Sequence, residues 1–178
     1  MNQIQIHDKS FQIFIHEDRI LTRVNELAKA ISKEFAQEQP LFIAVLNGSF
    51  IFAADLMKHM DFPCEIQFVK VSSYHGTQSS GKVQQVLGLS QPIKNRKVII
   101  IEDIIDSGLT IDFLRKDLLL QEPSSISICS LLVKPDALKV KLDVQYTGFE
   151  VDNHFLVGYG LDYDGLGRNL RHLYQAID

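Results

Sequence analysis

The residues that could do chemistry gather after an apolar segment near the middle of the chain. Residues 98–101 are Val-Ile-Ile-Ile, and two adjacent carboxylates, Glu102 and Asp103, follow directly. A third carboxylate, Asp106, precedes Ser-Gly-Leu-Thr at residues 107–110, which predict the start of a helix. The N-terminus of a helix has free N–H groups that bind phosphate, whereas carboxylates accept hydrogen bonds from hydroxyl groups. The pattern therefore indicates a ligand with both a phosphate and vicinal hydroxyl groups, as in a ribose phosphate.

A purely structural interpretation of these residues is also open. Asp106 would then be only the N-cap of the helix, and Glu102 and Asp103 would be solvated at the end of a strand. Each residue alone fits that interpretation. The whole pattern over residues 98–110 favours the ligand site, because Gly108 would also let the backbone approach a phosphate closely.

Three other segments add polar groups after apolar runs. Residues 46–50, Leu-Asn-Gly-Ser-Phe, are either a second anion site or an ordinary turn between strand and helix. Residues 72–81 are rich in Ser and Gly, and they are either a lid that excludes water or a plain surface loop. Lys134 follows the apolar residues 125–133, where its ammonium group could donate to a ligand oxygen.

Apolar periodicity predicts the elements that position these residues. Residues 20–35 carry a helical stripe that ends near Pro40, whereas residues 41–46 are a continuous apolar run typical of a strand covered on both faces. Further helices are predicted over residues 50–60, 107–122 and 168–177. Strands are predicted over a hairpin at residues 3–15 and over residues 65–71, 83–89, 97–104, 125–133, 144–150 and 154–161. Because strands and helices alternate, the predicted class is α/β with a mainly parallel sheet.

Length and composition indicate a single domain over residues 1–178, with a core at about 20–140 and a small hood from about 1–18 and 141–178. The 178 residues are 46% hydrophobic, which excludes global disorder. A net charge of −4 argues against a partner that is a long nucleic acid, and no apolar run reaches the ~18 residues of a membrane span. With no signal-peptide pattern and only two distant cysteines, we expect a cytoplasmic protein with buried thiols.

Five segments, in matching order and spacing, resemble the 6-oxopurine phosphoribosyltransferases of type I. They are residues 46–50, 72–81, 98–110, 131–135 and 154–164. The resemblance spans about residues 10–175 and implies the phosphoribosyltransferase fold, a twisted and mainly parallel sheet flanked by helices under a hood. It also implies purine salvage. In that reaction the 5-phosphoribosyl group of 5-phosphoribosyl 1-diphosphate passes to N9 of hypoxanthine or guanine, which gives IMP or GMP and diphosphate.

The resemblance implies a role for each residue of the acidic pattern. Asp106 would be the catalytic residue, next to purine N7, where it transfers a proton. The residues that would bind the 5′-phosphate are Asp106, Ser107, Gly108, Leu109 and Thr110. Glu102 and Asp103 would hold the ribose hydroxyls, directly or through Mg²⁺, which is the implied cofactor.

The other segments are implied to bind the purine, the metal and the diphosphate. The diphosphate residues would be Asn47, Gly48 and Arg168, with a cis peptide bond between Leu46 and Asn47. The purine residues would be Lys134, which donates to O6, Phe155, which stacks on the ring, Leu156 and Asp162. The Mg²⁺ ligands would be Glu102, Asp103 and Asp162. The residues of the flexible loop that would close over the site are Ser73 and Tyr74.

The partners implied are small molecules, 5-phosphoribosyl 1-diphosphate and a 6-oxopurine, rather than nucleic acid or membrane. Apolar residues of the predicted helix at 48–60 and the family habit favour a homodimer or homotetramer. One alternative is a non-catalytic regulator that binds nucleotides in the same pocket. Another is a phospho-receiver signalling domain, which shares clustered acids and a Lys-Pro pair such as Lys134-Pro135.

Overall fold

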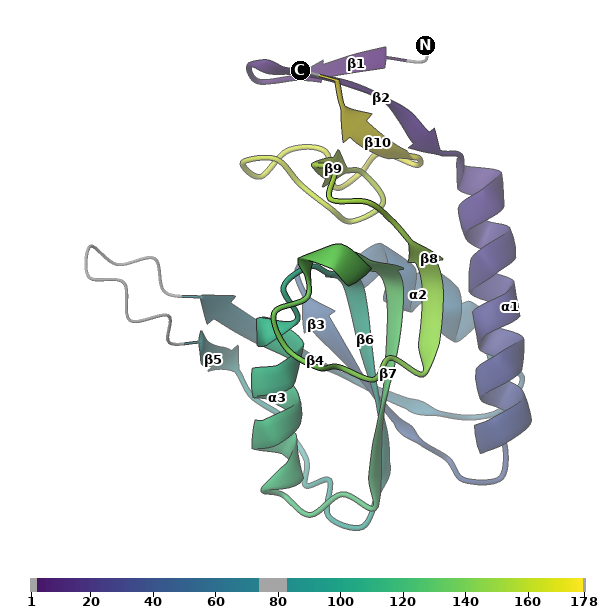
Figure 1. Ribbon diagram of the computed structural model, residues 1–178. Helices are drawn as coiled ribbons and strands as arrows, with labels where there is room; N and C mark the ends of the chain where they lie inside the picture. The colour runs from purple at the N-terminus through teal and green to yellow at the C-terminus, as the bar shows by residue number, and fades with distance from the viewer. Residues whose placement is uncertain (1–2, 74–82, 178) are drawn as a thin grey trace.

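The computed structural model describes residues 3–73 and 83–177, and in this part of the chain the strands form a six-stranded and a four-stranded sheet (Figure 1). The helices are α1 (Glu17–Phe35), α2 (Phe50–Lys58) and α3 (Leu109–Leu119), with a 3-10 turn at Pro135–Ala137. In spatial order, the larger sheet holds β5 (Val83–Leu87), β4 (Glu65–Ser73), β3 (Leu41–Leu46), β6 (Lys97–Ile105), β7 (Ser125–Val133) and β8 (Tyr146–Glu150). The smaller sheet holds β1 (Gln3–Ile6), β2 (Lys9–Ile15), β10 (Leu173–Ala176) and β9 (Leu156–Val157).

The larger sheet is parallel except at one edge. Strands β4, β3, β6, β7 and β8 run parallel, whereas β5 pairs antiparallel with β4. This arrangement confirms the predicted α/β class with a mainly parallel sheet. In the described residues, no helix is long and apolar enough to cross a membrane.

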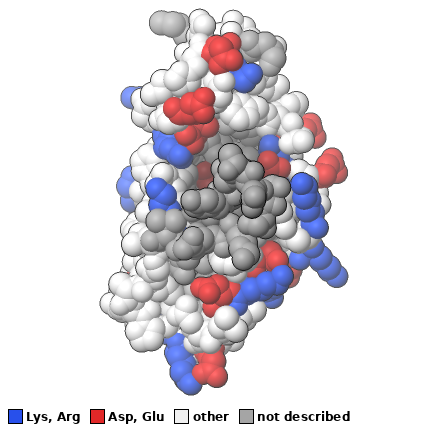
Figure 2. Space-filling model, turned by 90° about the vertical axis from the view of Figure 1, so that its left-hand side faces the viewer, with Lys and Arg blue, Asp and Glu red and all other residues white. Residues whose placement is uncertain are grey.

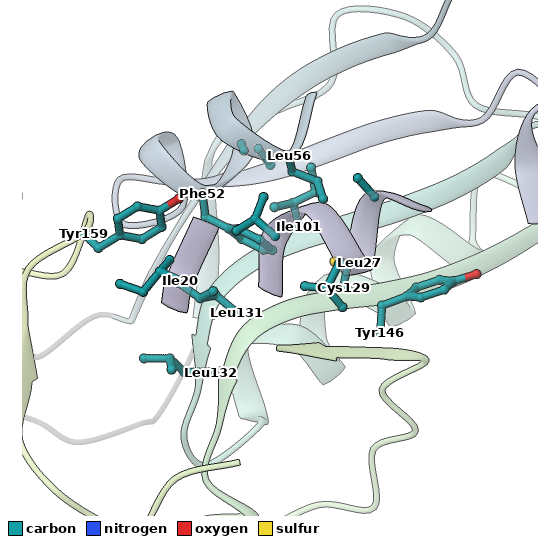
Figure 3. Packing of buried hydrophobic residues seen from close by; sticks show 14 of the residues in the cluster. Ile20, Leu27, Phe52, Leu56, Ile101, Cys129, Leu131, Leu132, Tyr146 and Tyr159 are labelled. Atoms are coloured by element: carbon teal, nitrogen blue, oxygen red, sulfur yellow. The ribbon is translucent and has the colours of Figure 1, made fainter. Parts of the chain in front are cut away.

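The side chains of a buried strand point alternately to the two faces of the sheet, and both faces are packed, which explains the continuous apolar runs. Phe42 and Ala44 of β3 pack into a cluster with residues of α1 and α2, while Ile43 and Val45 pack on the other face with residues of α3. Figure 3 shows part of the first cluster, in which Phe52 of α2 belongs to the same packed group as residues of β6 and β7. Because both faces of β3 and β6 are covered, these two central strands are largely buried, and hydrogen-bond pairing fixes their register.

The four-stranded sheet is the hood, and it lies over the carboxyl ends of the parallel strands (Figure 1). Its own small core contains Ile6, Phe11, Val157 and Tyr174. Strand β2 leads into α1, and β8 leads through an irregular segment into β9. The hood is therefore joined to the core through two segments, one near the N-terminus and one near the C-terminus.

Two predicted elements of the C-terminal region are wrong. The helix expected over residues 168–177 is strand β10, which pairs with β2 and β9. The strand expected over residues 154–161 is reduced to the two residues of β9. Glycines at positive φ bend the chain after β9, with Gly158 at 97° and Gly160 at 104°, so the segment reverses and returns in extended form to complete the hood sheet.

Candidate active site

Three carboxylates meet where β6 ends, at the edge of the sheet that faces the hood. Glu102 and Asp103 are each only 7% exposed. Together with Asp106 they line a cavity of about 540 Å³. Strand β6 lies between β3 and β7; its pairing with β3 ends at Ile101, and its pairing with β7 continues to Ile105. The structure therefore brings together the acidic residues that the sequence pattern singled out.

Burial makes Glu102 an unusual carboxyl group. Its Oε2 atom has no hydrogen-bond partner among the described residues. Burial first, and then the neighbouring Asp103, raise the pKa of Glu102 well above its ordinary value. The Asp103 carboxylate lies against Gly48, where a Cβ atom would come within 1.7 Å of its Oδ2 atom. A side chain at position 48 would therefore displace the Asp103 carboxylate from its present position.

The turn after β6 leads into the N-terminus of α3. Gly108, at φ 77°, occupies the N-cap position of α3 and has no side chain to cap it, and the Leu109 N–H donates only a long hydrogen bond of 3.5 Å to Ser107 Oγ. Ser107, Gly108 and Thr110 line the same cavity as the carboxylates. The N–H groups of the first turn are consequently available to a ligand, as a phosphate requires. Leu109, which is 45% exposed, is not among the residues that line the cavity.

Lys134 follows β7 and brings a buried cation next to this group. The residue is 7% exposed, and its backbone N–H donates to the Ile105 carbonyl at 2.9 Å. Its Nζ atom lies 3.2 Å from Asn153 Oδ1 and 3.5 Å from Asp106 Oδ2. The ammonium group is therefore held between an amide and the carboxylate that was singled out for proton transfer. Sequence reasoning missed Asn153, which no local pattern marks.

The hood supplies a second charged pair to the cavity, Asp162 and Arg168. Arg168 Nη2 lies 2.6 Å from Asp162 Oδ1, and Arg168 Nη1 donates to the Gly160 carbonyl at 2.7 Å. The other Asp162 oxygen accepts from the Gly165 N–H at 2.7 Å. Both side chains are thus already oriented before any ligand binds.

The hood turn also touches the loop that joins β3 to α2. A Cβ atom on Gly160 would lie 2.0 Å from the Gly48 carbonyl oxygen. The Leu46–Asn47 peptide bond in that loop is cis, and the Asn47 side chain is exposed. Gly48 lines the cavity whereas Asn47 does not, so the loop faces the site through its glycine. Sequence reasoning did not assign Gly160 to the site, since its close contact lies 112 positions away along the chain.

The remaining purine residues lie in the hood, outside the residues that line the cavity. Phe155 is 47% exposed, with its ring centroid 6.1 Å from that of Phe11 and 5.4 Å from that of Tyr163. Leu156 is buried in β9. The predicted flexible loop falls largely outside the described residues: Tyr74 is not described, and Ser73 is described only as the backbone end of β4.

The face of the molecule that Figure 2 shows, the left-hand side of Figure 1, carries mixed charge. In Figure 2, acidic and basic side chains are interspersed around the part of the face drawn in grey. The described residues of this face therefore offer local charged groups rather than one continuous basic surface of the kind that long nucleic acids require.

Comparison with known proteins decides the family. The model of the phosphoribosyl transferase domain matches residues 14–164. This chain belongs to the phosphoribosyltransferase family. Among the curated family members, a hypoxanthine-guanine phosphoribosyltransferase of Lactococcus lactis is 40% identical over 168 residues, which are 93% of this chain and 91% of that protein. The Aquifex aeolicus protein of the same name is 38% identical over 176 residues, or 98% of this chain and 99% of that one.

Solved phosphoribosyltransferase structures agree with the fold. A hypoxanthine-guanine phosphoribosyltransferase from Bacillus anthracis, solved with a HEPES molecule in its active site, has a TM-score of 0.87 at 40% identity and covers 92% of this chain and 97% of its own. A hypoxanthine phosphoribosyltransferase from Staphylococcus aureus has a TM-score of 0.88 at 36% identity, covering 93% and 90%. The phospho-receiver alternative is therefore wrong. Its acceptor carboxylate would also have to be exposed, whereas Asp103 is buried.

Proposed function

We propose that this phosphoribosyltransferase acts in purine salvage, transferring the 5-phosphoribosyl group of 5-phosphoribosyl 1-diphosphate to N9 of hypoxanthine and of guanine. The observation that carries the proposal is that one cavity is lined by the acidic strand end, the start of α3 and the Asp162–Arg168 pair. These groups suit, in turn, a ribose, a phosphate and a diphosphate. Relatives that are 38–40% identical over most of the chain carry the name hypoxanthine-guanine phosphoribosyltransferase.

The sugar phosphate would bind along β6 and the start of α3. The 5′-phosphate would accept hydrogen bonds from the backbone N–H groups of residues 107–110 and from the Thr110 hydroxyl. Glu102 and Asp103 would hold the ribose hydroxyls. Gly48, and the main chain around Asn47, would leave room for the diphosphate.

The purine would lie between Lys134 and the hood. The Lys134 ammonium group would donate to the exocyclic O6, which favours 6-oxopurines over adenine. Phe155 would stack on the ring, and the backbone of Leu156 and Asp162 would contact its edge. Asp106 would accept the N7 proton as N9 attacks C1 of the ribose, while the C1–O bond breaks and its electron pair leaves with the diphosphate.

The residues present fit a magnesium ion. The unpaired Glu102 Oε2 atom next to the Asp103 carboxylate offers oxygen ligands that a cation would satisfy, and Asp162 lines the same cavity. The described residues contain no group of three or more His, Cys, Asp and Glu side chains arranged for a metal. That is compatible with Mg²⁺, which commonly takes one or two carboxylates and otherwise phosphate oxygens and water. When bound, Mg²⁺ would neutralise and orient the diphosphate.

Three further properties belong to the same proposal. The chain would act as one domain, with the hood covering the site from above and residues 72–81 closing over it. It would work in the cytoplasm. It would assemble as a homodimer or homotetramer, for which the exposed Phe50 at the start of α2 offers apolar surface.

Release of diphosphate tests the proposal directly. The protein is mixed with Mg²⁺, 5-phosphoribosyl 1-diphosphate and hypoxanthine, guanine, xanthine or adenine in turn, and diphosphate and nucleotide are measured. We expect turnover with hypoxanthine and guanine and at least about a hundredfold lower kcat/KM with adenine, because Lys134 would then face an amino group instead of O6. Binding of nucleotide without diphosphate release would support the non-catalytic regulator instead.

A further inference from the structure

Tyr159 is a buried residue of the hood turn whose hydroxyl group reaches the core. It is 3% exposed, and its O–H donates to Asp55 Oδ2 on α2 at 2.7 Å. The other Asp55 oxygen accepts from Lys58 Nζ at 2.9 Å. Burial, and then the Asp55 carboxylate, raise the pKa of Tyr159, so its hydroxyl stays a donor at neutral pH. Figure 3 shows Tyr159 at the margin of the hydrophobic cluster that contains Phe52 of α2.

The backbone of the same residue holds the turn that carries Arg168. The Tyr159 N–H donates to the Leu170 carbonyl at 2.8 Å, and the Gly160 N–H donates to the Arg168 carbonyl at 3.0 Å. Arg168 in turn donates from Nη1 to the Gly160 carbonyl. Tyr159 itself has a φ of 48°, which a residue with a large side chain adopts only when its surroundings hold it there. Anchoring Tyr159 therefore anchors Arg168.

Asp55, at the other end of the hydrogen bond, lies on the helix that follows the Gly48 loop, which is proposed to bind the diphosphate. Helix α2 begins two residues after Gly48, and Asp55 lies in its second turn. Gly160, next to Tyr159, packs directly on the Gly48 carbonyl. The hood turn and the loop are thus joined twice, once by backbone contact and once by the Tyr159–Asp55 hydrogen bond. Neither Tyr159 nor Asp55 lines the cavity.

We infer that Asp55 and Tyr159 are positioning residues that hold Arg168 and the Gly48 loop at a fixed separation for the diphosphate end of the sugar substrate. This inference rests on the proposed function. The pair acts mainly on this substrate, because the purine side chains Lys134 and Phe155 are held by contacts that involve neither Asp55 nor Tyr159. Loss of the hydrogen bond is therefore felt in the binding of 5-phosphoribosyl 1-diphosphate rather than in the binding of the purine.

The test separates the two Michaelis constants. Tyr159→Phe removes only the hydroxyl group, and we expect the KM for 5-phosphoribosyl 1-diphosphate to rise about threefold to tenfold, the effect of one hydrogen bond. The KM for hypoxanthine should stay within about twofold, the scatter expected when an interaction is not touched. Asp55→Ala leaves the buried hydroxyl unpaired, so it should raise the same KM at least as much. The double variant should not exceed Asp55→Ala, since both changes remove one interaction.

Tyr146→Phe is the matched control. Tyr146 is also largely buried, and its hydroxyl donates to the Glu34 carboxylate on α1, away from the cavity. It should lower the melting temperature comparably and leave both KM values unchanged. The inference is overturned if Tyr159→Phe and Tyr146→Phe have the same kinetic effect, if both KM values rise together, or if the effects of Asp55→Ala and Tyr159→Phe add. A wild-type protein that releases no diphosphate would instead overturn the proposed function.

Discussion

The two halves of the candidate site are positioned in different ways. The core half, from Glu102 to the start of α3 together with Lys134, lies at or directly after the ends of the adjacent parallel strands β6 and β7, whose register is fixed by their pairing. The hood half, with Asp162 and Arg168, sits on an irregular turn held by backbone hydrogen bonds and glycines at positive φ. One half is set by regular secondary structure, and the other by contacts between distant segments.

Burial follows the same division except at Asp106. Glu102, Asp103 and Lys134 are each 7% exposed, whereas the side chains of Asp162 and Arg168 are 28% and 29% exposed; the Asp106 side chain is 59% exposed. Charges are strengthened by burial and weakened by solvent, so the buried groups of the core half are suited to stabilising charge, and Asp106 is open to a ligand. The hood half is suited to binding and releasing a charged group. We therefore expect variants of the core carboxylates to change kcat and variants of the hood pair to change KM.

The largest expected effect separates two carboxylates, one from each half. Asp106→Asn removes the proton acceptor, so kcat should fall by about 10²–10³-fold while both KM values change little. Asp162→Asn removes charge from the hood pair, so it should act mainly on the KM for the sugar diphosphate, by about threefold to tenfold. Steady-state kinetics with each substrate varied in turn measures both. Equal losses of kcat in the two variants would remove the distinction between the halves.

Two cations allow a second comparison, with an expected effect of about tenfold to a hundredfold. Lys134→Ala should raise the KM for hypoxanthine and leave that for the sugar diphosphate nearly unchanged. Arg168→Ala should do the reverse, because Arg168 lines the cavity and is the residue proposed to meet the diphosphate. A Lys134→Ala variant that binds both substrates equally poorly would contradict the role of Lys134 at O6.

The same division explains how much the sequence could predict. The core half was readable because an apolar run, adjacent acids and Ser-Gly-Leu-Thr are local patterns, and a buried strand followed by a helix needs no distant information. The α1 stripe from Ile20 to Phe35 was predicted for the same reason and is buried as expected. The roles of the individual site residues remain predictions.

Distant contacts explain what could not be predicted. Strand β10 exists because β2, at the other end of the chain, offers it a hydrogen-bonding edge, so its own residues gave no strand pattern strong enough to exclude a helix. The Tyr159–Asp55 hydrogen bond joins residues 104 positions apart. Gly160 needs to be glycine only because the Gly48 carbonyl lies against it. In each case the deciding partner is fixed by tertiary structure.

A comparison of two glycines in the hood turn tests the contact between this turn and the core. Both have positive φ, at 104° for Gly160 and 87° for Gly165, but only Gly160 is packed, since nothing lies within 4 Å of a Cβ atom on Gly165. Alanine at either position carries a backbone cost of about 1 kcal/mol. Gly160→Ala should cost about 1–2 kcal/mol more, because its methyl group must displace the Gly48 carbonyl. Denaturant unfolding measures the difference, and equal losses of stability would mean that the two halves are not in firm contact.

The smallest expected effect concerns stability and pH in the core half. The folded-state pKa of Glu102 lies above its ordinary value of 4.5, mainly because of burial. Below that value both the folded and the unfolded chain hold the proton, and burial of the carboxyl group carries no ionisation cost. As the pH rises further, the unfolded chain releases the proton first, so Glu102 progressively destabilises the folded state until its folded pKa is passed.

Glu102→Gln should therefore raise the melting temperature by a few degrees at neutral pH, and the gain should vanish near pH 4, when both proteins are compared with a chelator present. Asp162→Asn is the control from the hood half. Its carboxylate is paired with Arg168 and partly solvated, so its loss should lower the melting temperature slightly or leave it unchanged. A Glu102→Gln variant that is less stable than the wild type at neutral pH would show that burial of the Glu102 carboxyl group does not lower the stability of the folded state. The cost of burying Glu102 next to Asp103 would then no longer distinguish the two halves.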